Sequence, residues 1–165
     1  MNNKIQLIQN KILTLNQAVK LCAEWKKEGS IVFTNGCFDI IHSGHIHYLS
    51  SAAELGEKLI VGLNSDTSVK KLKGIDRPYN KESDRLLILA SLQFVDAVIL
   101  FEQDTPIKLI ESLTPNILVK GGDYSEEQIV GNEHVKMNGG KVISLEFIQG
   151  YSTTNFIKKV KNGKN

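Results

Sequence analysis

Hydrophobic residues along this chain gather into two kinds of segment that alternate over most of its length. One kind is a short run of successive apolar residues, which is typical of a strand buried on both faces. These runs predict strands over residues 30–35, 58–64, 96–101, 116–123 and 141–147. The other kind repeats its apolar residues every three or four positions, as an amphipathic helix does. This spacing predicts helices over residues 14–28, 45–56, 81–94, 105–113 and 152–160.

Residues at the ends of the helical segments agree with these boundaries. Thr14 suits the N-cap of the first helix, and Gly29 and Gly56 follow two of the helices as stops. Pro106 falls in the first turn of another helix, where its missing N–H costs no hydrogen bond.

Buried strands that alternate with amphipathic helices indicate an α/β fold with a parallel sheet covered on both faces. Right-handed crossovers then give a doubly wound, mainly five-stranded parallel sheet of Rossmann-like type in a single domain. We place an N-terminal extension and its helix at residues 1–29 and the sheet domain at residues 30–165.

Unusual polar clusters follow the strands. "TNGCFD" and "HSGH" follow the first, "NSD" the second, "FEQD" the third, "KGGDY" the fourth and "IQGYSTT" the fifth. The carboxyl ends of parallel strands meet at one edge, where doubly wound sheets bind their ligands. The clusters therefore predict one ligand site along this rim.

Composition narrows the class of protein. Hydrophobic residues make up 41% of the 165 residues and charged residues 23%, as in ordinary globular proteins. The net charge of +2 argues against a dedicated nucleic-acid binder. No apolar run is long enough to span a bilayer, and the N-terminus lacks a signal-peptide pattern. Two cysteines, Cys22 and Cys37, fit a reducing cytosol, so we expect a soluble cytoplasmic protein.

Three of the four histidines fall within the six residues from His42 to His47. If a helix begins near Gly44, the imidazoles of His42 and His45 lie at its N-terminus, which favours an anion. Gly44 lets a ligand oxygen approach the backbone. Two imidazole donors there suit the charge that develops on a phosphoryl group during transfer. His47 is left out of catalysis.

Two other interpretations of the histidines stay open. They could bind zinc, although Cys37 and Asp39 would then be needed to complete the site, because no regular ligand spacing is present. They could also be polar residues that cap a helix.

These motifs resemble a known family. "GCFDIIHSGHIHYL" is similar to the signature of the HxGH nucleotidyltransferases, which include cytidylyltransferases and pantetheine-phosphate adenylyltransferases. Six segments in order resemble the branch that acts on D-glycero-β-D-manno-heptose 1-phosphate: "TNGCFDIIHSGH", "LIVGLNSD", "KKLKGIDRPYN", "FEQDTPIKLI", "LVKGGDY" and "GYSTTNFIKK". The resemblance covers residues 12–160 and implies the Rossmann-like nucleotidyltransferase fold for the sheet domain.

The resemblance implies roles for particular residues. The catalytic residues it implies are His42, His45, Lys73 and Arg85. The nucleotide-binding residues are Asn35, Gly36, Cys37, Phe38, Gly44, Lys120, Gly121, Gly122, Ser152, Thr153 and Thr154. The substrate-binding residues are Asp39, Asn64, Asp66 and Asp123. No fixed metal site is implied, and Mg²⁺ would arrive with the nucleotide phosphates.

Each role has a plainer alternative. Lys73, in a cation-rich loop after the second strand, could serve solubility, and Arg85 could be an exposed helix arginine. Residues 120–123 could form a plain turn. Asp39 could instead orient His42 or the turn before it, and Asp66 could cap a helix. The hydroxyls of residues 152–154 exceed what capping alone requires.

The resemblance implies an adenylyltransferase that joins ATP and heptose 1-phosphate into ADP-heptose and pyrophosphate, for bacterial surface glycans such as the lipopolysaccharide core. It also implies a homodimer, no nucleic-acid or membrane partner, and a separate sugar kinase, since 165 residues leave no room for one. Within the enzymes, the alternative is a cytidylyltransferase for a small phosphorylated alcohol such as glycerol 3-phosphate. Those enzymes carry an arginine shortly before the "GxSTT" element, and this chain has none there. Outside the enzymes, the alternative is a catalytically silent nucleotide-binding module.

Overall fold

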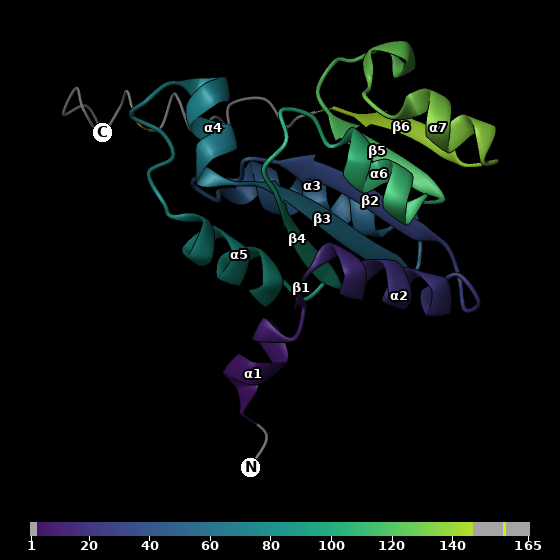
Figure 1. The fold of residues 1–165 in the computed structure, drawn as a ribbon, viewed down its shortest axis with the longest axis horizontal. Helices are drawn as coiled ribbons and strands as arrows, with labels where there is room; N and C mark the ends of the chain where they lie inside the picture. Colours follow the sequence, from purple (N-terminus) through teal and green to yellow (C-terminus); the bar gives the residue numbers. More distant parts are fainter. Residues whose placement is uncertain (1–2, 147–156, 158–165) are drawn as a thin grey trace.

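The computed structural model describes residues 3–146 and 157. Six parallel strands form one sheet in the order β1-β4-β3-β2-β5-β6 (Figure 1). The strands are β1 (Ile12–Leu13), β2 (Ile31–Gly36), β3 (Lys58–Asn64), β4 (Ala97–Phe101), β5 (Ile117–Gly121) and β6 (Lys141–Leu145). The α/β class, the parallel sheet and the five predicted strands are confirmed, and β1 is an additional strand at the edge.

Helices cover both faces of this sheet. They are α1 (Lys4–Gln9), α2 (Leu15–Trp25), α3 (Ser43–Ala53), α4 (Asp66–Lys73), α5 (Glu82–Ser91), α6 (Ile107–Leu113) and α7 (Asn132–Met137), with a 3₁₀ turn η1 (Glu126–Gln128). Residues of α2, α6 and α7 join the core on one face, and residues of α3 and α5 join the core on the other. The sheet is therefore doubly wound.

The central strand β2 shows why the strand segments read as continuous apolar runs. Ile31 and Phe33 point into one core and Val32 into the other, and all three side chains are fully buried. Val32 lies between Leu59 of β3 and Ile117 of β5 in the sheet. Because both faces of a central parallel strand are covered, hydrophobic burial favours apolar residues at successive positions.

The chain before residue 30 contributes to the same sheet. Strand β1 pairs with β4, and Ala18 and Cys22 of α2 are buried in the core. Thr14 caps α2 as expected, since its side chain accepts a hydrogen bond from the backbone of Gln17. None of the helices in the described ranges has the length and apolarity that a bilayer crossing requires.

The structure differs from the sequence interpretation after β3. Residues 66–73 form the helix α4, so residues 70–73 of the cation-rich segment that we expected to be a loop are helical. Ser65 caps its first turn, Asp66 follows there, and lysines fill its last turn, so the charges suit the helix dipole. Helix α7 was likewise not predicted. The predicted helix over residues 152–160 lies, apart from Ile157, outside the described residues.

Candidate active site

The carboxyl ends of the central strands enclose a cavity of about 490 Å³. It is lined by residues from β2, β3 and β5 and from the segments that follow these strands and β4, including Asn35, Gly36, Cys37, Phe38, His45, Asn64, Lys73, Asp104, Lys120 and Gly121. Apart from Lys73, these residues belong to four of the five polar clusters, so a cavity lies at the predicted rim. The fifth cluster, with Ser152, Thr153 and Thr154, lies outside the described residues.

The turn between β2 and α3 places two imidazoles together. His42 occupies the N-cap position of α3, but its side chain makes no capping hydrogen bond. The rings of His42 and His45 stack with their centroids 3.8 Å apart and their planes 16° apart. Gly44 is buried beneath this turn, whereas His47 is exposed. Helix capping therefore does not explain the histidines, and His47 lies apart from the pair.

The electrostatic surroundings keep this pair neutral. The pKa of His45 is lowered to about 4, mainly by burial, and also by repulsion from Lys73 and from His42 whenever His42 is protonated. Burial also lowers the pKa of His42. Neutral imidazoles can each donate one N–H, which suits hydrogen bonding to the oxygens of a phosphoryl group.

Phe38 supports His45 from the side. Its ring meets the imidazole edge-on, with the centroids 5.4 Å apart, and only 6% of the residue is exposed. The backbone of Phe38 has a φ of 42°, a left-handed conformation that is rare for a bulky residue. Such strain is commonly retained where it fixes a functional turn. A ring in contact with the histidine and a strained backbone both indicate that this turn is held in one shape.

Lys73 lines the cavity from the last turn of α4. The residue is exposed, and Gly74 ends the helix with a φ of 101°. Lys73 is near enough to His45 to lower its pKa. A flexible ammonium at this position can reach an anionic ligand in the cavity, which agrees with the role that the resemblance implied.

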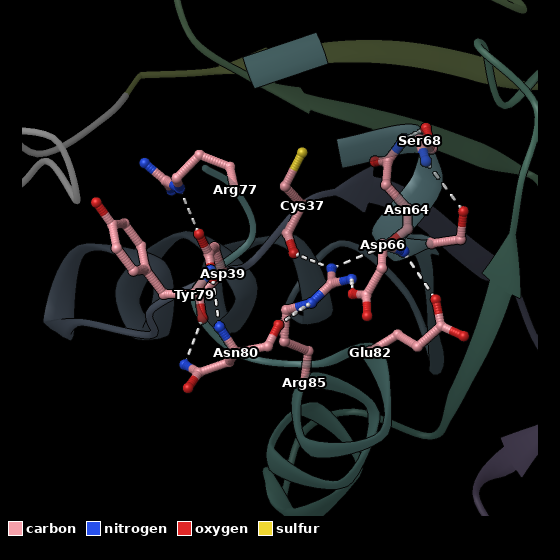
Figure 2. Close-up of polar contacts among 11 residues, drawn as sticks. Cys37, Asp39, Asn64, Asp66, Ser68, Arg77, Tyr79, Asn80, Glu82 and Arg85 are labelled. Atoms are coloured by element: carbon pink, nitrogen blue, oxygen red, sulfur yellow. Dashed lines mark hydrogen bonds and ion pairs between the residues drawn. The ribbon is translucent and has the colours of Figure 1, made fainter. Parts of the chain in front are cut away.

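The placement of Arg85 differs from both interpretations of the sequence, a catalytic arginine and an exposed helix arginine. It is fully buried, so the interpretation as an exposed helix arginine is wrong. Its guanidinium donates to the carbonyl oxygens of Cys37, Asn64 and Asn80 at 2.6, 2.9 and 3.0 Å, and to Asp66 at 2.7 Å (Figure 2). Four protein acceptors occupy this side chain. In this arrangement Arg85 ties together the ends of β2 and β3 and the segment before α5, and acts as a positioning residue.

Asp39 is similarly occupied. Its carboxylate is 1% exposed and accepts hydrogen bonds from Arg77 Nε at 2.6 Å and from the backbone of Tyr79 and Asn80 at 2.7 and 3.0 Å (Figure 2). A carboxylate that accepts three hydrogen bonds and has almost no exposed surface has little capacity left for a sugar hydroxyl. The geometry therefore supports the alternative in which Asp39 orients the turn, here by joining it to residues 77–80.

The other predicted acceptor-binding residues lie at different depths. Asn64 lines the cavity, but its amide donates to Ser68 at 2.9 Å. Asp66 accepts from Arg85, and Ser65 caps α4 in its place. Asp123 is exposed and does not line the cavity. The structure thus brings Asn64 alone of the four predicted acceptor-binding residues to the cavity wall.

The end of β5 carries a second lysine into the cavity. Lys120 Nζ lies 3.3 Å from the amide oxygen of Asn35. Burial lowers the pKa of Lys120, and Cys37 acts in the opposite direction. Gly122 adopts a φ of 121° and hydrogen-bonds to Leu145 of β6, so this turn is fixed to the sheet.

Several wall residues were not predicted. Tyr48, Leu72, Thr105 and Tyr124 line the cavity. The Tyr48 hydroxyl lies 2.6 Å from that of Thr34, and burial raises the pKa of Tyr48 to about 12. Tyr48 follows His45 by three residues, a spacing that places both on one helix face and could have revealed it. The others come from segments whose closeness depends on the fold.

Among the described residues, no group of three or more histidine, cysteine or acidic side chains is placed to hold a metal ion. Asp39, which the zinc interpretation required, is engaged by Arg77. The residues that can meet an anion in the cavity are instead the imidazole and ammonium groups of His45, Lys73 and Lys120.

A parallel doubly wound sheet with paired imidazoles and lysines at its carboxyl edge defines an α/β protein whose strand ends suit a ligand that carries phosphate. The cytidylyltransferase-like family model matches residues 33–159, and the chain belongs to this family.

The chain is also similar to curated proteins described as bifunctional protein HldE. It is 49% identical over 152 residues to the one from Magnetococcus marinus, which covers 92% of this chain and 31% of that protein. It is 50% identical over 153 residues to the one from Campylobacter fetus, which covers 93% of this chain and 32% of that protein. The chain therefore spans about a third of the length of these relatives.

Two solved structures share the fold. The lipopolysaccharide core biosynthesis protein from Thermoplasma volcanium aligns with a TM-score of 0.61 and 28% identity, over 75% of this chain and 99% of that one. Pantoate-beta-alanine ligase from Francisella tularensis, solved with an ATP analogue and β-alanine, aligns with a TM-score of 0.60 over 91% of this chain and 76% of that one. At 17% identity the ligase shows the likeness of the fold alone.

Proposed function

We propose that this chain transfers AMP from ATP to D-glycero-D-manno-heptose 1-phosphate, which yields ADP-heptose and pyrophosphate. An oxygen of the sugar phosphate attacks the α-phosphorus of ATP, and the bond from that phosphorus to the bridging oxygen of pyrophosphate breaks. The attacking oxygen is already ionised at neutral pH, so no protein base is required. The reaction depends mainly on positioning and on stabilisation of charge.

The observation that carries this proposal is the stacking of His42 on His45, which lines the cavity together with Lys73. Neutral imidazole N–H groups would hydrogen-bond to the non-bridging oxygens, whose charge increases in the transition state. Lys73 would contact the leaving pyrophosphate. Mg²⁺ bound to the nucleotide phosphates would neutralise part of their charge. Arg85 and Asp39 keep the ends of the strands in place.

The choice of heptose rests on the six motif segments and on about 50% identity to the proteins described as HldE. The neighbour from Thermoplasma volcanium is described as a lipopolysaccharide core biosynthesis protein, which supports a role in the synthesis of such glycans. We further propose that the chain acts in the cytoplasm as a homodimer and that a sugar kinase supplies the sugar 1-phosphate.

A pyrophosphate-release assay tests this proposal. ATP and CTP are each combined with heptose 1-phosphate and with glycerol 3-phosphate. We expect ATP with heptose 1-phosphate to give the highest kcat/KM. A tenfold preference for CTP with glycerol 3-phosphate, about 1.4 kcal/mol in transition-state stabilisation, would reject the heptose assignment. Absence of turnover with every pair, despite ATP binding, would identify a silent nucleotide-binding module.

The metal requirement is tested in the same assay. We expect EDTA to abolish pyrophosphate release and added Mg²⁺ to restore it, because the metal accompanies the phosphates. Stoichiometric zinc that copurifies with the protein and is lost in the variant His45→Ala would contradict this view.

A further inference from the structure

The active-site cavity continues into a smaller side chamber of about 220 Å³. Five residues line both spaces: Asn35, Pro106, Lys120, Tyr124 and Val130. Gln128 and Ile129 line the side chamber and not the main cavity. Pockets for drug-sized ligands have volumes of about 300–1,000 Å³, so the side chamber suits a single sugar better than a whole nucleotide.

Lys120 lies where the two spaces meet. Its ammonium donates to the neutral amide of Asn35, and within residues 3–146 it forms no ion pair. Burial lowers its pKa, because removal from water disfavours the charged form. A partly buried cation with a neutral partner is stabilised most by an anionic ligand.

The strand order places the strand before the histidine turn between the strands that precede or carry the two lysines. Strands β3, β2 and β5 are neighbours in that order. His42 and His45 follow the central strand β2, Lys73 belongs to the helix after β3, and Lys120 ends β5. In-line displacement at phosphorus has a matching arrangement, because the incoming and leaving oxygens lie on opposite sides of the phosphorus atom. The histidines would then face the phosphorus, and each lysine would face one of the two oxygens. With Lys73 at the leaving pyrophosphate, Lys120 is on the side of the incoming phosphate.

We propose that Lys120, together with Asn35, binds the phosphate of the incoming sugar 1-phosphate and that the side chamber binds its sugar. The inference rests on the proposed nucleotidyl transfer and names the subsite of its acceptor. Tyr124 and Gln128 offer polar groups to sugar hydroxyls, and Ile129 and Val130 offer apolar surface to the C–H groups of the ring. Lys120, which the sequence interpretation assigned to the nucleotide, is therefore an acceptor-binding residue.

The test is the variant Lys120→Met, which keeps the length of the side chain and removes its charge. The matched control is Lys108→Met on the exposed surface of α6. Loss of a charged hydrogen bond to phosphate corresponds to about a ten- to hundredfold loss of affinity. We expect the KM for the sugar 1-phosphate to rise by this factor in Lys120→Met, while the KM for ATP stays within threefold. Lys120→Arg should recover most of the acceptor affinity.

A second variant covers the case in which Lys120→Met does not fold. Asn35→Asp keeps the size of a half-buried residue and places a carboxylate beside the ammonium of Lys120. This neutralises the cation and repels the acceptor phosphate, so we expect the same selective rise in acceptor KM. A rise confined to the KM for ATP in either variant would overturn the inference.

Binding measured without turnover separates this inference from the proposed function. Isothermal titration with glucose 1-phosphate and with heptose 1-phosphate should show at least tenfold weaker binding to Lys120→Met than to the wild type. If the wild type binds sugar 1-phosphates through Lys120 but releases no pyrophosphate, the proposed function fails and the subsite stands. If the wild type turns over and Lys120→Met binds the acceptor normally, the subsite fails and the function stands.

Discussion

The imidazole of His45 lies between the stacked ring of His42 and the edge of Phe38. Its Nδ1 is buried and has no hydrogen-bond partner among the described residues. An unsatisfied polar atom costs stability in the folded protein, and it is retained where a ligand uses the group. At the scale of the single residue, His45 is thus the side chain most clearly placed for chemistry.

Replacement of His45 by alanine tests this placement. A donor to a developing oxyanion contributes on the order of 10²–10³ in rate, so His45→Ala should lower kcat by at least this factor with little change in KM. His47→Ala is the control, because His47 is exposed on the same helix, and its kcat should stay within a few-fold of the wild type. Steady-state kinetics with thermal melts would measure both. Equal damage from the two changes would contradict the assignment.

The pKa of His45 also predicts how stability depends on pH. Its value of about 4 in the folded chain lies below its ordinary value of 6.5, so the unfolded chain binds the proton more readily. Its contribution to stability is therefore fully present above about pH 6.5 and is lost as the pH falls towards 4. Urea unfolding from pH 7 to pH 4.5 should show a smaller loss for His45→Gln than for the wild type. His47→Gln should follow the wild type, and an identical pH dependence in all three proteins would refute the prediction.

At the scale of elements, the segment between α4 and α5 is fixed to the sheet at two points. Asp39 binds its residues 77–80, and Arg85 binds the carbonyl of Asn80 from the other side (Figure 2). The same guanidinium reaches the ends of β2 and β3. The histidine turn, the end of β3 and this segment therefore form one connected unit.

Loss of the Asp39 charge should weaken this unit. Asp39→Asn leaves the guanidinium of Arg77, which is 13% exposed, beside a neutral amide. Removal of one partner from a buried ion pair costs about 3–5 kcal/mol, so we expect a loss of unfolding free energy in this range. The control is Asp104→Asn. The side chains of Asp104 and Lys71, which form an ion pair, are 75% and 61% exposed, so this pair should contribute less than about 1 kcal/mol to the unfolding free energy. Denaturant unfolding measures both, and equal effects would show that burial of the pair does not matter.

The positioning role of Arg85 can be tested by a substitution that keeps the positive charge but removes the branched guanidinium. Lysine keeps the charge but cannot reach four acceptors at once, so Arg85→Lys should lower both thermal stability and kcat. If the arginine acted only by contact with phosphate, activity would fall while the melting temperature stayed unchanged. Thermal melts and steady-state kinetics on the same preparation distinguish the two roles.

At the scale of the whole molecule, the N-terminal elements leave apolar side chains at the surface. Ile5 and Leu7 of α1 are 43% and 55% exposed, and α1 projects from the edge of the sheet (Figure 1). Trp25 of α2 is not part of this exposed surface, because it packs against the core with Lys58 over its ring. Exposed apolar residues on a projecting helix are candidates for a subunit contact.

The proposed homodimer can be tested by measuring the molar mass of the protein in solution. Light scattering should yield about twice the chain mass of 18.4 kDa. Leu7→Lys should shift the protein towards the monomer, because it places a charge in the contact. Met137→Lys is the control, since Met137 is 86% exposed on α7 near the opposite edge of the sheet. A monomeric wild type at assay concentration would reject the proposal.

The sequence by itself was enough for the α/β class, the five main strands and a cavity at the carboxyl ends of the strands. Buried parallel strands require apolar residues on both faces, and parallel connection brings their carboxyl ends to one edge. The histidine pair could also be identified from the sequence, because three neighbouring histidines after a strand form a local pattern. The edge strand β1 has two residues, and α7 has six, which is too short for a periodic signal.

Only the tertiary structure decided which polar side chains remain available for a ligand. The guanidinium of Arg85 donates hydrogen bonds to residues 37, 64, 66 and 80. The carboxylate of Asp39 accepts hydrogen bonds from residues 77, 79 and 80. Lys120, in contrast, has a neutral partner and lies where the main cavity meets the side chamber. A pattern in sequence reports the type of a side chain and its period. Its burial and its hydrogen-bond partners depend on distant segments that meet only when the sheet is assembled, and these partners separate a positioning residue from a ligand-binding one.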